Sequence, residues 1–548
     1  MMSLALNVIQ RDNKCVHFSF ISIINDCSVP MEKESRVKKT LLNAKVNTIC
    51  YFASLFIAFF TRKIFLDYLG AHFIGFASTA QSLLGFLNLA ELGVGTAIGY
   101  VLYKPIYNGE KDKICEIVSV FGYIYRIIGF VILGSGIILS LFLPKIFADT
   151  PFPLPVIYVG FYAFLFSSLL GYFVNYRMTL LSADQRNYVV TGYFQLTMSL
   201  KVIVQMILAI VLTNFYVYFF IEILFGIVNS CILNYKIHQT YPWLSTNIAR
   251  GRKLLTDYPE IGKYVRQLFV HKISGFTQLQ ILPLLIYHFT SLPVVALYDN
   301  YVLISQRLKG VISGTLDSTG AGIGNLISEG NETLIYSTYK ELFSFRLYIA
   351  GVIGACLFRL SSPFISVWLG HEYVLSNMLV LLIIIQVFTT VMRGATDQFL
   401  FGYGLFYDVW APVTETVLSV AVALIAGHYL GLGGVLMGPI IASLFIAHLW
   451  KPFFLYSKGL AKPFSQYVIM FTKHVLPIPV LFFIVVYLSD KLLNYNLSST
   501  SWGYWILYSL LFTSLYAILL FLVYYSIVPS FRHFVSRFFR IKHKHTLN

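Results

Sequence analysis

The sequence predicts an all-helical protein that crosses a lipid bilayer about fourteen times. Of its 548 residues, 57% are hydrophobic and only 12% are charged, whereas soluble domains are about 45–50% apolar and about 25% charged. Apolar stretches of about 20 residues recur almost to the end of the chain, and each is long enough to cross ~30 Å of hydrocarbon. These observations exclude a soluble enzyme, a secreted disulfide scaffold and a nucleic-acid-binding module.

The expected spans are separated by short polar segments. Two of them, 73–102 and 293–326, are long and rich in Gly, Ser, Asn and Gln. We interpret each as one tilted or kinked crossing, because neither can be split into two full crossings. The fourteen spans are expected at about 40–61, 73–102, 117–143, 154–176, 188–213, 215–235, 267–290, 293–326, 342–368, 374–395, 409–430, 433–450, 467–488 and 502–527.

The distribution of basic residues predicts the orientation. If the N-terminus is cytoplasmic, most Lys and Arg residues of the loops fall on the inner side. The outer side then holds only Arg62, Lys63, Lys145 and Lys491. An excess of basic residues marks the cytoplasmic side, so both termini are expected there. The net charge of +16 is therefore attributed to topology rather than to nucleic-acid binding.

The halves of the chain correspond at a constant offset. Phe73-Ile74-Gly75-Phe76 falls on Pro293-Val294-Val295-Ala296, and Gln195 falls on Glu415. Paired repeats of membrane helices are typical of secondary transporters, in which substrate binds between the halves. The expected organisation is an N-terminal extension at 1–36, an N-lobe at 37–238 and an inter-lobe loop at 239–266, followed by a C-lobe at 267–458, two additional spans at 459–529 and a basic tail at 530–548.

The sequence contains none of the common motifs of enzymatic chemistry. The six cysteines are scattered without a C-x-x-C pair, which argues against a metal or disulfide framework. No P-loop, HExxH motif or nucleophile elbow occurs in the sequence. No cofactor is expected, and a proton or sodium gradient, the membrane potential or a downhill lipid gradient remains as the source of energy.

Several segments carry a family resemblance. They are Leu69–Ile114 (LGAHFIGFASTAQSLLGFLNLAELGVGTAIGYVLYKPIYNGEKDKI), YRIIGFVILG, LLSADQRNY, LFVHKISG, YDNYVLI, GAGIGNLI and SPFISVWLG. These strings resemble bacterial polysaccharide repeat-unit flippases of the Wzx type, in the superfamily that includes MATE multidrug exporters and the lipid II flippase. The resemblance implies two six-helix lobes in a V, with spans one, two, seven and eight lining a cavity. It also implies two C-terminal spans that often contribute a lipid-tail groove. One departure is Gln278-Leu279-Gln280 in span seven, where relatives often have an acidic patch.

Polar residues inside the spans are the candidate site residues, because ionisable groups in hydrocarbon normally face a cavity or a partner. Spans two and eight each place such residues on one face. The cavity candidates for substrate binding are Lys45, Asn47, Gln81, Asn88, Glu91, Lys201, His271, Lys272, Gln278, Asp299, Gln306, Arg307 and Lys309. The candidates for ion coupling are Glu222, Asp397 and Glu415.

Structural alternatives apply to several of these residues. Lys45, Arg62 and Lys63 lie near span ends, where long basic side chains commonly reach the interface. Lys201 lies near the centre of span five and either pairs with Glu222 or faces the cavity. Pairing with Arg residues is likewise the alternative for Asp397 and Glu415.

The sequence leads to three hypotheses for function. The first is a flippase for undecaprenyl-pyrophosphate-linked oligosaccharide in the bacterial cytoplasmic membrane, whose partners are membrane lipids and, as a further expectation, the polysaccharide polymerase machinery. The second is a MATE-like drug exporter, which basic residues in the cavity disfavour. The third is a membrane-embedded polymerase or acyltransferase, for which no sizeable outer loop is evident.

Overall fold

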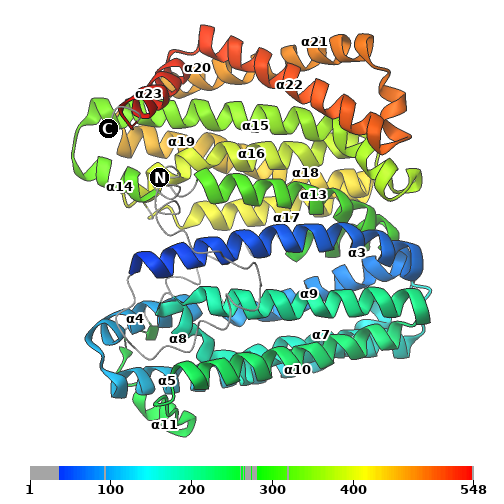
Figure 1. Cartoon of the computed structure of the whole chain (residues 1–548), viewed down its shortest axis with the longest axis vertical. Helices are drawn as coiled ribbons and strands as arrows, with labels where there is room; N and C mark the ends of the chain where they lie inside the picture. Colours follow the sequence, from blue (N-terminus) through cyan, green and yellow to red (C-terminus); the bar gives the residue numbers. More distant parts are fainter. Residues whose placement is uncertain are drawn as a thin grey trace, which may run out of the picture.

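The computed structural model describes residues 36–91, 94–184, 186–259, 261–262, 265, 273, 280–316, 320–405 and 407–545. These residues form helices that lie side by side (Figure 1). Eleven of the described helices are long and apolar enough to cross a membrane. The chain is therefore an all-helical multi-pass membrane protein, as predicted.

The first lobe contains the helices from α3 to α10, and Figure 1 shows them in blue to green. Its elements are α3 (Arg36–Leu87), η1 (Asn88–Glu91), α4 (Val94–Asn108), α5 (Lys111–Ser140), α6 (Leu143–Ile146), α7 (Leu154–Phe173), η2 (Asn175–Arg177), α8 (Met178–Ala183), α9 (Asn187–Leu212) and α10 (Phe215–Thr240), followed by α11 (Ile248–Leu254).

The second lobe and the two additional spans complete the bundle. The lobe contains the short helix Gln280–Phe289 and α13 (Leu292–Leu316), α14 (Gly320–Ser328), α15 (Glu332–Trp368), η4 (His371–Tyr373), α16 (Asn377–Gly402), α17 (Trp410–Leu430), α18 (Leu432–Ser443), η5 (Leu444–Trp450), α19 (Lys451–Phe454) and η6 (Leu455–Gly459). It is followed by α20 (Phe464–Val475), α21 (Pro477–Leu492), η7 (Tyr495–Ser499), α22 (Trp502–Ile527) and α23 (Pro529–His545).

The expected fourteen crossings are consistent with this set. The long helix α3 contains two crossings, because its backbone leaves helical geometry at Gly70, where φ is 84°. A residue with a side chain is strained at such an angle, so glycine permits the turn. The helix α13 and the segment Gln280–Phe289, which is the described end of the seventh expected span, correspond to two further spans. The first of the two long spans predicted to be kinked changes from α-helix to 3₁₀ helix at η1. In the second, residues 317–319 between α13 and α14 lie outside the described residues.

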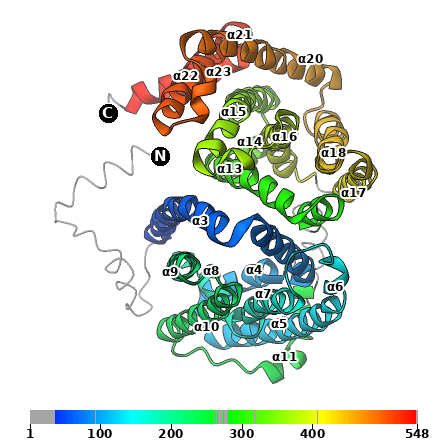
Figure 2. The same ribbon diagram turned by 90° about the vertical axis from the view of Figure 1, so that its right-hand side faces the viewer.

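The two lobes meet where α3 packs against α13, and Figure 2 shows these helices facing one another between the lobes. At Gly75 an added Cβ atom would lie 2.0 Å from the carbonyl oxygen of Leu292, so only glycine allows this approach. Trp368 of α15 donates a hydrogen bond of 3.0 Å to the Phe59 carbonyl and stacks on the Phe59 ring. The predicted architecture of two lobes plus two C-terminal helices is confirmed.

The predicted inter-lobe loop is docked on the first lobe. The Asn247 amide donates to the Ser119 hydroxyl at 3.0 Å, and the Tyr258 hydroxyl donates to Glu116 at 2.6 Å. Tyr241 donates to Asp184 at 2.9 Å. Burial, together with the Asp184 carboxylate, raises the pKa of Tyr241 well above its ordinary value, so this hydroxyl remains a donor.

The domain boundaries themselves remain predictions, and residues 1–35 of the expected N-terminal extension lie outside the described residues.

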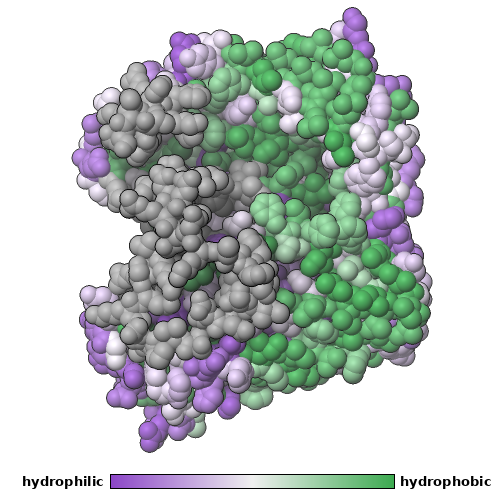
Figure 3. Space-filling model, viewed as in Figure 1, coloured by the Kyte–Doolittle hydropathy of each residue, from purple (hydrophilic) through white to green (hydrophobic). Residues whose placement is uncertain are grey.

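The surface carries a membrane-facing belt. Figure 3 shows apolar residues across both lobes, with hydrophilic residues at the two ends of the bundle. Exposed side chains such as Phe130, Leu212, Ile425 and Leu510 contribute to this surface. So many exposed large apolar side chains are compatible with a lipid surrounding, because soluble proteins rarely expose extended apolar patches.

The last two spans attach to α15 through both apolar and polar contacts. One stripe of α22, formed by Tyr508, Phe512, Tyr516, Leu520 and Tyr524, is fully buried. Their spacing of four residues places all of them on one helix face. The expected basic tail is the helix α23, which begins within this attachment, since Phe531 is buried and Phe534 stacks on Phe345.

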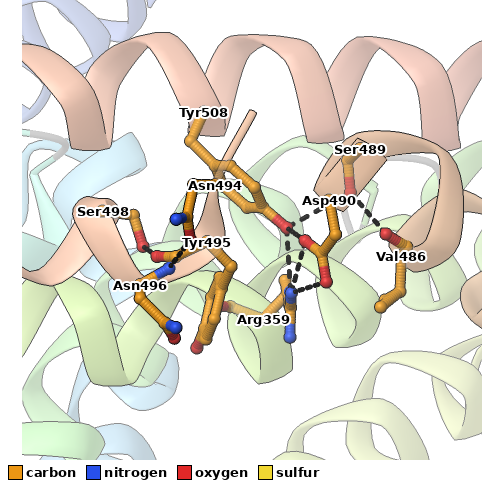
Figure 4. Close-up of polar contacts among 9 residues, drawn as sticks. All are labelled: Arg359, Val486, Ser489, Asp490, Asn494, Tyr495, Asn496, Ser498 and Tyr508. Atoms are coloured by element: carbon orange, nitrogen blue, oxygen red, sulfur yellow. Dashed lines mark hydrogen bonds and ion pairs between the residues drawn. The ribbon is translucent and has the colours of Figure 1, made fainter. Parts of the chain in front are cut away.

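A polar cluster closes the attachment at the other end of α15 (Figure 4). Arg359 forms an ion pair of 2.5 Å with Asp490 of α21, and its guanidinium lies 3.4 Å from the Tyr495 ring centre. Tyr508 donates to Asp490 at 2.6 Å and accepts from Arg359 at 3.0 Å. The cluster therefore joins α15, α21, η7 and α22 through one guanidinium.

We predict that Arg359→Ala destabilises the protein by about 1–3 kcal/mol, because α15 loses the contacts of this guanidinium with Asp490, Tyr495 and Tyr508. The measurement is thermal unfolding of the purified protein in detergent. The control is Lys63→Ala, because Lys63 pairs with Asp67 on the surface and its loss is expected to cost less than about 0.5 kcal/mol. Equal stability of the two variants would show that the cluster does not hold the last spans.

Candidate functional site

A polar cavity of about 430 Å³ lies between the lobes. Its walls come from α3, α9, α10 and α13, and its polar lining includes Ser54, Thr61, Arg62, Ser78, Gln81, Gln195, Ser199, Tyr218, Asp299 and Arg307. The volume is within the range of pockets that hold drug-sized ligands. We call this space the interlobe cavity.

Arg62 connects the two lobes across this cavity. From α3 it donates a hydrogen bond of 2.8 Å to the carbonyl of Ala296 and another to the side chain of Asn300, both on α13. The Asp299 carboxylate supplies an opposite charge that interacts with Arg62, and it also accepts a hydrogen bond from Ser78. The Arg62 guanidinium thus holds α3 and α13 together.

Arg307 lies on the same face of α13, two turns from Asn300. Its guanidinium donates to the Ser54 hydroxyl at 3.1 Å and lies 5.9 Å from the ring centre of Tyr51. Tyr51 in turn donates to the Arg307 carbonyl. Among the described residues that line the interlobe cavity, two arginines and one aspartate are charged. The cavity is therefore electropositive.

An apolar groove of about 600 Å³ adjoins the interlobe cavity. It is bounded by α3, α13, α15 and α22, and its lining includes Phe52, Leu55, Phe59, Val352, Ile353, Leu357, Leu360, Phe364, Trp368 and Trp505. Arg307 is the one charged residue among its described lining residues. Because Ala58, Leu303 and Arg307 line both spaces, the groove and the cavity meet at Arg307.

Comparisons with solved structures give the fold. A structure of the lipid II flippase MurJ in an inward closed conformation is similar, with a TM-score of 0.59, 15% identity and coverage of 87% of this chain and 98% of that chain. An inward-facing multidrug resistance MATE transporter of the MOP superfamily is similar with a TM-score of 0.56, 15% identity and coverage of 78% and 96%. The chain has the fold of MOP-superfamily transporters. Neither protein-family models nor curated protein sequences give a match.

Within this MOP-type fold, three of the predicted site residues gather between the lobes. Gln81, Asp299 and Arg307 line the interlobe cavity. Lys45, Asn47 and Gln306 are exposed and do not line it, and Lys309 is half-buried and also outside its lining. His271, Lys272 and Gln278 lie outside the described residues. Helical spacing in the sequence identifies residues that share one face of a helix. It does not show whether that face contacts a neighbouring helix, a cavity or lipid.

The predicted polar face of span two is divided. Gln81 lines the interlobe cavity, whereas Asn88 and Glu91 line a separate cavity inside the first lobe. The division occurs where the chain changes from α-helix to the tighter 3₁₀ helix at Asn88, which alters the angle between successive side chains. Asn88 and Glu91 are therefore not at the site between the lobes.

The three carboxylates predicted to couple transport to an ion, Glu222, Asp397 and Glu415, each pair with a basic side chain. Glu222 forms an ion pair of 2.8 Å with Lys201. Arg393 pairs with Asp397 at 2.9 Å and with Glu415 at 3.1 Å. For Lys201 the structure shows the pairing alternative, and this lysine is not among the residues that line the interlobe cavity.

Arg62 and Asn300 are the main residues that the sequence prediction missed. Arg62 was expected to reach the membrane interface, because it lies near a span end. It instead crosses to the other lobe, whereas its neighbour Lys63 is half-exposed and pairs with Asp67 as an interfacial residue does. The sequence did contain a signal for this contact between the lobes. Arg62 and Asp299 carry opposite charges, and they lie on two spans that were expected to line the same cavity.

We predict that Lys201→Ala strongly destabilises the protein, by about 3–5 kcal/mol, because it leaves the Glu222 carboxylate buried without a cation. The double variant Lys201→Ala with Glu222→Ala is expected to recover most of that stability. Thermal unfolding in detergent and the yield of folded protein measure the effect. A single variant as stable as the wild type, with impaired transport, would instead assign Lys201 to the substrate.

We also predict that Arg62→Ala loosens the contact between the lobes, because α3 and α13 lose their two hydrogen bonds through this guanidinium. Spin labels at Lys145→Cys and Glu372→Cys, in a background without native cysteines, report the distance between the lobes. The distribution should broaden toward longer distances in Arg62→Ala and remain unchanged in the neighbouring control Lys63→Ala. An unchanged distribution in Arg62→Ala would contradict the role of Arg62.

Proposed function

We propose that this chain is a flippase for polyprenyl-pyrophosphate-linked oligosaccharide repeat units. It moves them from the inner to the outer leaflet of the bacterial cytoplasmic membrane by alternating access, for the synthesis of surface polysaccharide. The observation that carries this proposal is the junction at Arg307 between an electropositive cavity and an apolar groove.

The two parts of this site match the two chemical parts of such a lipid. A pyrophosphate is anionic, and the planar guanidinium groups of Arg62 and Arg307 suit phosphate oxygens, which they bind through paired N–H donors. A polyprenyl chain is entirely apolar and gains free energy where apolar side chains shield it from water. The groove between α3, α13, α15 and α22 supplies such side chains.

The last two spans have a defined place in this proposal. Trp505 and Thr513 of α22 line the apolar groove, and the Arg359 cluster and the buried stripe of α22 hold that helix against α15. The resemblance to Wzx-type flippases implies the same use of the C-terminal spans. The similar MurJ structure is described as a lipid II flippase, which supports a lipid-linked substrate for this fold.

The orientation supports loading from the cytoplasmic leaflet. The start of α3 and the helices α11, α14 and α23 lie at one end of the bundle (Figure 1). This is the end that the excess of basic residues assigns to the cytoplasm. Both termini are accordingly proposed to be cytoplasmic, and a polysaccharide polymerase would receive the repeat units on the other side.

A MATE-like exporter of cationic drugs is the alternative function, since a MATE transporter shares the fold. The charge of the interlobe cavity argues against it, because two arginines face one aspartate and a cationic ligand would be repelled. Transport of a fluorescent cationic drug therefore serves as the competing assay.

We predict that the purified protein in proteoliposomes moves a fluorescent polyprenyl-pyrophosphate oligosaccharide between leaflets, and that Arg307→Ala lowers the initial rate about tenfold or more. Loss of a charge-assisted hydrogen bond to phosphate of about 1.5–3 kcal/mol corresponds to at least this factor. The rate is measured by quenching of the outer-leaflet probe with a membrane-impermeant reagent.

The control variant is Arg252→Ala, because Arg252 is exposed on α11, away from the site. It should leave the rate unchanged, and thermal unfolding of Arg307→Ala should show that the protein still folds. Drug transport without movement of the lipid-linked oligosaccharide would reject the proposed function, and a wild-type rate in Arg307→Ala would reject the proposed site.

A further inference from the structure

We propose that a cluster of aromatic rings at one end of the apolar groove is a gate between the lobes, and that the polyprenyl chain of the substrate opens it. The cluster consists of Phe59 of α3, Phe364 and Trp368 of α15, and Trp502 and Trp505 of α22. We call it the aromatic gate. The inference rests on the proposed function for the identity of the chain, and it adds the residues that control when the lobes separate.

The aromatic gate lies at the end of the bundle that the distribution of basic residues assigns to the outer side. The helix α15 ends at Trp368 and α22 begins at Trp502, and Figure 1 shows both at the end opposite to α11, α14 and α23. Tyr51 and Val352 line the groove about two turns or more nearer the other end of the same helices. The gate therefore forms the outer end of the groove.

Stacking and edge contacts hold the rings of the gate together. The Phe59 and Trp368 rings are stacked, with centroids 5.0 Å apart and an angle of 7° between their planes. Phe364 contacts Trp502 and Trp505, with centroid distances of 5.7 and 5.1 Å. Trp368 also donates a hydrogen bond of 3.0 Å to the Phe59 carbonyl. The rings of α15 and α22 thus form one unit, and Phe59 is the ring that the first lobe adds to it.

Separation of the lobes at their outer ends must move Phe59 away from Trp368. Without a chain in the groove, this movement removes an aromatic pair and leaves the N–H of the buried Trp368 without its acceptor. A chain in the groove would contact both rings directly, since Phe59 and Trp368 line it. Contact with the chain then replaces contact between the rings, which lowers the free-energy cost of opening.

A polar contact on the same turn of α3 meets the other part of the substrate. Arg62 follows Phe59 by three residues, so the two side chains lie on one side of the helix. Arg62 lines the interlobe cavity and binds α13, whereas Phe59 lines the apolar groove and stacks on α15. The anionic head and the apolar chain therefore each act on one contact between the lobes. Opening then requires both parts of one molecule, which makes the gate selective for a lipid-linked substrate.

The test measures opening of the lobes and needs no transport. The full-length protein carries spin labels at Lys145→Cys and Glu372→Cys, in a background without native cysteines, and is placed in phosphatidylcholine nanodiscs. Undecaprenyl phosphate in the bilayer should shift the distance distribution toward longer distances. Inorganic pyrophosphate supplies only the anionic part and should not shift it. Phosphatidic acid at the same mole fraction should not shift it either, because its polar ester groups would have to enter an apolar groove.

A variant of the gate itself gives the second measurement. Trp368→Leu removes the stacked ring and the hydrogen bond, so it should raise the ratio of open to closed protein about tenfold without any added lipid. Undecaprenyl phosphate should then cause little further shift. The matched control is Tyr287→Leu, because Tyr287 stacks on Phe147 of the other lobe with centroids 5.5 Å apart but does not line the groove. This control should keep the response of the wild type to undecaprenyl phosphate.

A variant that fills the groove separates the chain from its phosphate. Leu55 lines the groove and is exposed, so Leu55→Trp occupies space in the groove without replacing a core residue. It should abolish the response to undecaprenyl phosphate. Leu510→Trp, on the exposed surface of α22 outside the groove lining, should not. A wild-type response in Leu55→Trp, or equal responses of the wild type to undecaprenyl phosphate and phosphatidic acid, would overturn the proposal.

Failure of the gate and failure of the proposed function give different results. A shift with undecaprenyl phosphate, in a protein that does not transport the lipid-linked oligosaccharide, would support the gate and reject the proposed function. Transport of that oligosaccharide without any shift would support the proposed function and overturn the gate.

Discussion

The structure depends on the compensation of charge inside hydrocarbon. An ionised side chain within the bundle is tolerated only when an opposite charge, a proton or water accompanies it. Lys201 with Glu222, Arg393 with Asp397 and Glu415, and Arg359 with Asp490 meet this requirement. Each group joins residues of neighbouring helices, so the ion pairs also determine which helices lie together. The same rule identifies functional candidates, because a charge without a fixed partner must find one in a ligand.

The interlobe cavity departs from local neutrality. Between the lobes, Arg62 and Arg307 face a single aspartate, which favours an anion. Inside the first lobe, the Glu91 carboxylate accepts hydrogen bonds from the phenols of Tyr125 and Tyr172. Span two contributes to both cavities, through Gln81 to the interlobe cavity and through η1 to the cavity inside the first lobe.

The candidate site was predictable in part. Asp299 and Arg307 were identified because they interrupt an apolar span with charge, and the structure places both at the interlobe cavity. Arg62 was missed because its position near a span end has an ordinary interfacial explanation, which its neighbour Lys63 does satisfy. The apolar groove was not visible as a pattern at all. Its lining comes from α3, α13, α15 and α22, and the apolar residues of one helix look the same whether they face lipid, protein or a bound chain.

The sequence by itself determined that this protein is a bundle of membrane-spanning helices in two repeated halves. Spans are local properties, since about 20 consecutive apolar residues must cross the bilayer as a helix that satisfies its own backbone hydrogen bonds. Only the tertiary structure decided which charges are compensated and which are left for ligands. It paired Lys201 with Glu222, carried Arg62 across to α13 and left Glu91 among phenols. Those outcomes depend on how each helix is rotated against its neighbours, and that rotation is set by contacts between residues far apart in the chain.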